Sequence, residues 1–418
     1  MNMRTIQEHS LALSIREEAS RHFGGRYGAG LQALVLTGSM ARNEATTVEV
    51  DGVRRVLGDA EFLLIFRDSV AWLPDDVELT ADCARIEAAL RDLGIACAIG
   101  ANRAYPDYLR RMKPHIFGYE LRTCGQVLLG DPDILSLMPS FSAKDIPCED
   151  GWQLLMNRLI ELLKPAAQAR SGTGSLPRDL HYRTVKLYLD MAASLLLFSG
   201  SFEAGYRGRC ERLREIAALG DQSSDLPDGA GKHWPFPPDK FARRVAEATD
   251  YKLSGQTGDP GREWEYLRDA LAYAHALWRW ELARLTGRGE RRLSDADDTD
   301  ERLFACWARC EPVQSRLRGW ASQLRKPGVR RDLLRRPSWV LGAWKASPRY
   351  CVYSAAARLV FRVPELLSGR ASEPDSVWNA IARRLPLRAA TTECAPAWRQ
   401  LARSIARNYE ELLIGTRA

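Results

Sequence analysis

Two carboxylates lie at the start of an apolar segment that has the length of a strand, and they are spaced so that they could act together. Asp59 and Glu61, called the carboxylate pair below, lie two positions apart at the beginning of the run that ends at Phe66. Strand alternation places both on one face of a sheet, with Ala60 and Phe62 on the other, core-facing side. Adjacent carboxylates are costly to leave unpaired, and a divalent cation is the usual reason to place them together. The pair therefore predicts a Mg²⁺ site, because Mg²⁺ prefers oxygen ligands and commonly binds beside phosphates.

A glycine and a serine precede the carboxylate pair, at the end of the apolar run 31–36. Gly38 would let the backbone approach a phosphate closely, and Ser39 adds a hydroxyl. The sequence from Met40 to Ala45 predicts a helix, whose N-terminus would favour an anion. Together these features predict a triphosphate site beside the metal. Taken singly, the glycine and serine are also typical of a turn, and the carboxylate pair of a solvent-facing edge strand.

This order of motifs resembles the nucleotidyltransferase superfamily, which includes DNA polymerase beta and the aminoglycoside nucleotidyltransferases. In that family an apolar strand is followed by Gly-Ser, a helix, and Asp-x-Asp/Glu in the next strand. The segment GSMARNEA at 38–45 also resembles the GSxARGE form of bacterial members. The resemblance covers about residues 30–130. It implies that Gly38 and Ser39 hold the nucleotide phosphates and that the carboxylate pair binds Mg²⁺ or Mn²⁺.

Three further residues are candidates for nucleotide binding. Arg42 belongs to the GSMARNEA segment, although Arg42 and Glu44 could equally form an exposed helix pair. Residues 186–213 are similar to the helical domain that follows the catalytic domain in bacterial members. That second resemblance implies that Lys186, Tyr206 and Arg209 face the cleft between domains. Ordinary helix-surface positions are the alternative for Lys186 and Tyr206.

The sequence departs from the family pattern in two ways. The first is the spacing, since 19 residues separate Ser39 from the carboxylate pair. A two-residue hairpin at Asp51-Gly52 explains this as an insertion that leaves its ends close together. The second departure concerns a third carboxylate, which the family needs on a neighbouring strand. The predicted strand 95–99 carries no such residue. Glu120, in an apolar segment expected to form a strand, is the chosen catalytic candidate, and Asp107 is another option.

The resemblance implies a Mg²⁺-dependent enzyme that moves a nucleoside monophosphate from a nucleoside triphosphate to an acceptor hydroxyl and releases pyrophosphate. A small molecule, a sugar derivative, a protein or an RNA end could be the acceptor. A chain without the third carboxylate would instead be a catalytically impaired nucleotide-binding or regulatory protein of the same fold. A nucleic-acid-binding protein that acts through its C-terminal region is a further alternative.

The order of predicted elements fits this chemistry. Strands and helices alternate up to about Asp131, and long helical periods follow after Pro147. We therefore expect an α+β nucleotidyltransferase domain with a small mixed sheet, followed by all-α helical domains. The expected boundaries are residues 1–145 for the first domain, 146–290 for a helical bundle and 291–418 for a basic helical C-terminal region.

Charge is divided unevenly along the chain. The net charge is +7, yet residues 311–418 hold 20 Lys and Arg against 8 Asp and Glu, a net of +12, which leaves −5 for the rest. This excludes a uniformly basic nucleic-acid coat and predicts an anionic partner for the basic tail. Nucleic acid and an anionic membrane surface are both open, with the Trp- and Arg-containing segment 337–366 as the contact. Nine scattered cysteines and no apolar segment of membrane-spanning or signal-peptide character predict a cytoplasmic protein, in which peripheral membrane contact stays open.

Overall fold

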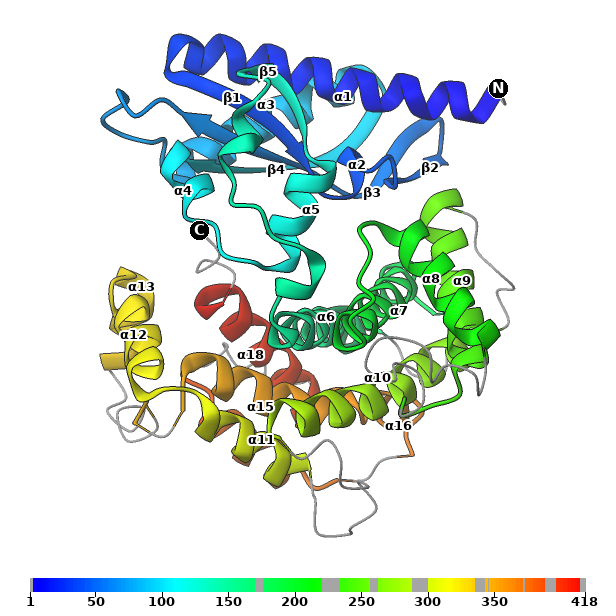
Figure 1. The fold of residues 1–418 in the computed structure, drawn as a ribbon. Coiled ribbons are helices and arrows are strands. Elements are labelled where there is room, and N and C mark those ends of the chain that lie inside the picture. The colour runs from blue at the N-terminus through cyan, green and yellow to red at the C-terminus, as the bar shows by residue number, and fades with distance from the viewer. Residues whose placement is uncertain are drawn as a thin grey trace. The chain divides into compact units, whose positions relative to one another are not determined.

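The computed structural model has a mixed α+β fold in which helices predominate and strands form one small sheet (Figure 1). This confirms the coarse class expected from the sequence. The structure describes residues 3–169, 176–219, 234–255, 262–287, 300–334, 343–344, 346–370, 373–387 and 396–413.

The chain divides into two compact units. The first, here called the α/β unit, comprises Met1–Asp150, Ser199–Leu219 and Ala242–Gly258. The second, the helical unit, comprises Gly151–Phe198, Gly220–Phe241 and Asp259–Ala418. The α/β unit thus recruits two later segments of the chain. The three-region division at 145 and 290 stays a prediction.

The α/β unit carries all five strands that the structure describes. In chain order its elements are α1 (Met3–Tyr27), β1 (Leu31–Thr37), α2 (Gly38–Ala41), β2 (Thr46–Val50), β3 (Val53–Phe66), α3 (Asp76–Asp92), β4 (Ile95–Ala104), α4 (Pro106–Arg110), α5 (Ile116–Cys124), β5 (Gln126–Gly130), α8 (Tyr206–Leu219) and most of α9 (Pro238–Ser254).

The long strand β3 organises the sheet. The strand order is β2-β3-β1-β5, and β4 pairs with β3. β1 and β2 run antiparallel to β3, whereas β4 runs parallel to it. The hairpin expected at Asp51-Gly52 is confirmed, and both residues have the positive φ (53° and 75°) that type I′ turns require. β2 pairs with the first part of β3 and β1 with the last part, so the hairpin is an extension of the strand that carries the carboxylate pair.

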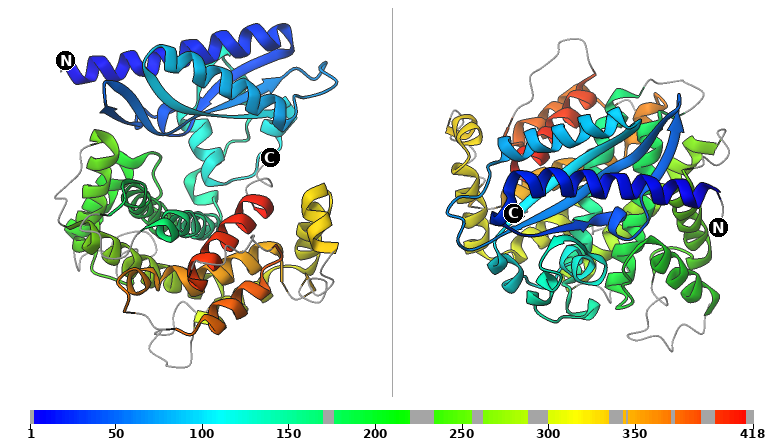
Figure 2. Two further views of the ribbon diagram at one scale, coloured as in Figure 1. Left: turned by 180° about the vertical axis from the view of Figure 1, so that it is seen from behind. Right: turned by 90° about the horizontal axis from the view of Figure 1, so that it is seen from above.

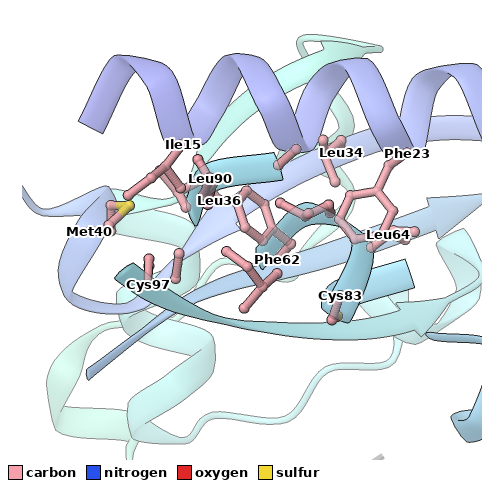
Figure 3. Close-up of a cluster of buried hydrophobic side chains, with 14 of the residues drawn as sticks. Ile15, Phe23, Leu34, Leu36, Met40, Phe62, Leu64, Cys83, Leu90 and Cys97 are labelled. Atoms are coloured by element: carbon pink, nitrogen blue, oxygen red, sulfur yellow. The ribbon is translucent and has the colours of Figure 1, made fainter. Parts of the chain in front are cut away.

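Helices cover both faces of the sheet. On one face, α1 and α3 lie side by side, as the view from above in Figure 2 shows. Their apolar stripes pack on alternate strand residues, among them Leu34, Phe62 and Leu64 (Figure 3). On the other face, Leu63 and Ile65 pack with residues of α4 and α5. Burying each of these large side chains contributes about 1.5–3 kcal/mol, so both faces of β3 are firmly fixed.

The helical unit is built around a cluster of aromatic side chains. Its helices are α6 (Cys148–Gln168), α7 (Arg178–Phe198), α10 (Glu263–Leu285), α11 (Asp300–Cys310), α12 (Val313–Leu324), α13 (Pro327–Leu334), α15 (Pro348–Val360), α16 (Val363–Leu367), α17 (Asp375–Arg384) and α18 (Ala397–Leu412). Trp152 is fully buried, with ring centroids 4.6 Å from Trp307 and 5.6 Å from Tyr353. No helix in the described part of the chain is both long and apolar enough to cross a membrane.

Most tail tryptophans that the structure describes belong to this core. Trp320, Trp378 and Trp398 are buried, which agrees with the structural role that tryptophans most often have. Trp344 differs, since it is 66% exposed. Trp339 lies outside the described residues.

Candidate functional site

The carboxylate pair lies on one face of β3, as strand alternation predicts. Asp59 and Glu61 are exposed, while Ala60 and Phe62 are buried against the α1 and α3 side. Gly58 directly precedes the pair with φ of 131°, at an irregularity in the register between β3 and β4. Such irregularities re-aim the side chains that follow them.

The glycine of the predicted triphosphate site touches the carboxylate pair. Thr37, the last residue of β1, is opposite Glu61 in the sheet, and its Oγ1 donates to the Glu61 carbonyl at 3.3 Å. Gly38 follows with φ of 68°, and a Cβ at this position would lie 2.6 Å from Glu61 Oε2. Two segments predicted separately from the sequence therefore meet, and the positive φ favours glycine at the point where they do. Ser39 comes next and is half-buried.

The helix expected after Ser39 is much shorter than predicted. Only Gly38–Ala41 forms a helical turn, whereas the sequence predicts a helix through Ala45. Asn43 has φ of 55°, a left-handed conformation that Asn tolerates and that ends a helix. A single turn carries little helix dipole, because a macrodipole needs aligned peptides. The N-terminus of so short a helix therefore offers an anion less than the longer helix expected from the sequence would.

The neighbouring strand β4 offers no acid beside the carboxylate pair. Asp59 pairs with Ala98 and Glu61 with Gly100, and Asn102 is the next residue on that face. A Cβ on Gly100 would lie 3.8 Å from Asp59 Oδ2, so β4 runs close beside the carboxylate pair. Within the described residues, no group of three or more His, Cys, Asp or Glu could hold a metal ion.

Two carboxylates can nevertheless be enough protein ligands for Mg²⁺. Mg²⁺ is usually held by one or two carboxylates, with substrate phosphates and water completing its coordination. The pair is exposed on one face, next to a backbone segment that a side chain would obstruct. The carboxylate pair could therefore supply two ligands to a divalent cation, with the remaining ligands coming from elsewhere than this pair.

Glu120 is not on a strand, contrary to the sequence prediction. It lies in the helix α5, where Ile116 and Leu121 are buried. Its carboxylate accepts a hydrogen bond from Arg42 Nη1 at 2.8 Å and another from Arg209. Burial alone would raise the pKa of Glu120, but Arg209 and Arg42 hold it below its usual range. Glu120 is therefore an ionised partner of two arginines, and the structure does not bring it to the carboxylate pair.

Asp107, the other acid considered from the sequence, lies in the short helix α4. It forms an i, i+4 ion pair with Arg111, with Oδ2 2.9 Å from Nε. Such pairs at a helix surface are ordinary stabilising contacts. Asp107 thus belongs to no metal cluster of the described residues either.

Arg42 and Tyr206 meet, but within a buried network of charges. The Arg42 side chain is 7% exposed and pairs with Glu120 and, at 3.1 Å, with Glu44. Burial opposes the charge of Arg42, yet the carboxylates of Glu120 and Glu44 raise its pKa above the ordinary value. The Arg42 guanidinium lies 5.2 Å from the centroid of the Tyr206 ring. Through these contacts, the side chains of Arg42 and Tyr206 connect α5, α8 and the turn that follows α2.

Glu44 lies at the centre of this network, and its role there was not predicted from the sequence. It is buried rather than on an exposed helix face, and its carboxylate accepts hydrogen bonds from the backbone N–H groups of Tyr206 at 2.9 Å and Arg207 at 3.0 Å. A carboxylate there stabilises the N-terminus of α8. No local signal could have revealed this, because the partners are more than 160 residues apart in sequence.

Lys186 belongs to the helical unit. It lies on α7, with its ammonium 6.0 Å from the centroid of the Tyr182 ring. The positive charge of Arg158, together with burial, lowers the pKa of Lys186. Its assignment to nucleotide binding stays a prediction.

The chain was compared with protein-family models, with curated proteins and with solved structures, and no match was found in any of the three. The features of this chain that bear on function are therefore its motif residues, above all the end of β1 where it lies next to the carboxylate pair.

Proposed function

We propose that the α/β unit binds a nucleoside triphosphate with Mg²⁺ and transfers its nucleoside monophosphate to an acceptor hydroxyl, releasing pyrophosphate. The observation that carries this proposal is the approach of Gly38 to Glu61, where an added Cβ would lie 2.6 Å from the carboxylate. A backbone without a side chain next to two exposed carboxylates suits a phosphate chain and its cation. The scattered cysteines favour the cytoplasm as the place of this activity.

Each residue of the site has a distinct role in this proposal. Asp59 and Glu61 hold the cation, and Gly38 and Ser39 contact the β- and γ-phosphates through a backbone amide and a hydroxyl. When bound, Mg²⁺ neutralises the charge that develops on the phosphoryl oxygens. The cation matters more here than in a basic site, because residues 1–310 have a net charge of −5.

Nucleotide binding tests the site directly. We expect the full-length protein to bind a fluorescent nucleoside triphosphate with Mg²⁺ and to lose most of this binding in EDTA. The double variant D59N/E61Q should weaken binding at least about tenfold, since it removes both charges that attract the cation while keeping side-chain shape. Equilibrium titration measures the effect. The matched control E49Q/D92N removes two other exposed carboxylates of the α/β unit and should bind as wild type. Equal binding by D59N/E61Q and wild type would contradict the metal site.

A second candidate function is nucleotide binding without transfer. It is favoured by one specific observation, the absence of an acid at Ala98, Gly100 and Asn102 on the β4 face beside the carboxylate pair. Nucleotidyl transfer needs a group that accepts the proton of the acceptor hydroxyl. A sensor or regulatory protein of the same fold needs only the bound nucleotide.

Pyrophosphate release separates the two candidates. The protein is incubated with each nucleoside triphosphate, Mg²⁺ and a panel of hydroxyl acceptors that includes sugars, peptides and RNA. Release that depends on the acceptor and disappears in D59N/E61Q supports the transferase. Tight Mg²⁺-dependent binding without release under any of these conditions supports the binding protein.

A further inference from the structure

The helices α12 and α13, and the residue Trp344 beside them, expose large apolar side chains. The two helices lie side by side at the periphery of the helical unit in Figures 1 and 2. On α12, Val313 and Leu317 are four residues apart, hence on one helix face, and are 43% and 44% exposed. Leu334, at the end of α13, and Trp344 are each 66% exposed. Arg316 Nη1 donates to the carbonyl of Trp344 at 3.2 Å, which places that residue beside α12.

The same helices carry an unbalanced positive charge. Between Val313 and Leu334 there are six Lys and Arg residues and a single acid, Asp332, which pairs with Arg407 at 3.0 Å. Four of the arginines are exposed and form no ion pair within the described part of the chain: Arg318, Arg325, Arg330 and Arg331. We call these four, with the exposed apolar residues Val313, Leu317, Leu334 and Trp344, the α12–α13 face.

The segment 337–366, for which the sequence predicts contact with an anionic partner, is described only in part. Of residues 337–366, the part at 337–342 and residue 345 lie outside the described residues. The helix α15, by contrast, turns Val352, Tyr353 and Leu359 into the core. Of the exposed residues in the α12–α13 face, Trp344 lies within that segment, whereas the arginines and the aliphatic residues lie earlier in the chain, on α12 and α13 or between them.

We propose that the α12–α13 face binds the surface of an anionic lipid bilayer. Exposed arginines attract anionic headgroups, and Trp344 is of the residue type that prefers the interface between headgroups and acyl chains. The aliphatic side chains decide between the two anionic partners. Leu317 and Leu334 gain by entering the boundary of the acyl region, whereas a nucleic-acid backbone offers aliphatic groups no comparable burial.

Vesicle sedimentation tests this proposal with the full-length protein. We expect binding to vesicles of phosphatidylcholine mixed with phosphatidylglycerol, weakening with salt, and little binding to phosphatidylcholine alone. The variant R330E/R331E should lose about fivefold in binding for each arginine removed. The variant L317S/W344S should lose about tenfold, because it removes the inserted apolar surface and leaves the charge unchanged.

Matched controls separate the face from overall charge and hydrophobicity. R383E/R384E makes the same charge change on α17, where both arginines are exposed, and should alter binding less than about twofold. W72S removes another exposed Trp, in the α/β unit, and should bind as wild type. Circular dichroism confirms that each variant is folded.

Three outcomes would overturn the proposal: absence of binding to anionic vesicles, equal loss in R383E/R384E and R330E/R331E, or unchanged binding in L317S/W344S. Nucleic-acid binding that is abolished by R330E/R331E, with no vesicle binding, would assign the face to nucleic acid instead. The carboxylate pair belongs to the α/β unit and the α12–α13 face to the helical unit. The nucleotide-binding test and the vesicle-binding test can therefore fail independently of each other.

Discussion

At Gly38 a hydrogen takes the place of a side chain, next to the Glu61 carboxylate. We expect G38A to lose about 1 kcal/mol of stability, because its φ of 68° is strained for a residue with a Cβ. The variant should also weaken Mg²⁺-nucleotide binding, since its Cβ would displace the Glu61 carboxylate. Urea unfolding and nucleotide titration measure the two effects.

Gly52 provides the control for that prediction. Its φ of 75° imposes similar strain on an added Cβ, but no atom lies within 4 Å of where that Cβ would be. G52A should therefore lose similar stability and keep wild-type nucleotide binding. Similar nucleotide affinities in G38A and G52A would show that the contact with Glu61 does not matter for the site.

The residues that the sequence predicted well are those determined by local rules. The exposure of Asp59 and Glu61 follows from the two-residue period of a strand, and the Asp51-Gly52 hairpin follows from turn chemistry. Glu120 was misplaced because its segment is short, and short apolar segments do not distinguish helix from strand.

At the scale of elements, the network around Glu44 explains how α8 joins a sheet that ends long before it in sequence. Two backbone amides of α8 and one arginine converge on this buried carboxylate. Gly205 precedes the helix with φ of 80°, and a Cβ there would lie 3.0 Å from Glu44 Oε1. Nothing in the residues flanking Glu44 indicates these partners, so this part of the fold could not be predicted from periodicity.

We expect E44Q to lower the free energy of unfolding by about 1–3 kcal/mol. The amide group of Gln replaces one acceptor oxygen with a donor that faces backbone N–H groups, and it removes the negative charge at the helix N-terminus. Urea unfolding followed by circular dichroism measures the loss. E49Q, on an exposed position of β2, should change stability by less than about 0.5 kcal/mol. Equal stability of E44Q and E49Q would contradict a stabilising role for the Glu44 network.

For the molecule as a whole, a buried acid in the helical unit links stability to pH. Glu281 on α10 is fully buried, and neither of its carboxylate oxygens has a hydrogen-bond partner within the described residues. Burial raises its pKa to about 8. Between the usual carboxyl pKa and about 8, the folded protein keeps a proton that the unfolded chain releases. Stability must therefore fall as pH rises through this window and level off above it.

The variant E281Q should remove this dependence, since its side chain stays neutral at every pH. Relative to E281Q, the wild type should lose on the order of 5 kcal/mol between the acidic and the alkaline end of the window. Urea unfolding followed by tryptophan fluorescence reports on the relevant unit, because Trp72 is the only tryptophan of the α/β unit. Parallel pH profiles for wild type and E281Q would mean that Glu281 is ionised when folded. Water would then have to reach it, since an unpaired buried charge is too costly to persist.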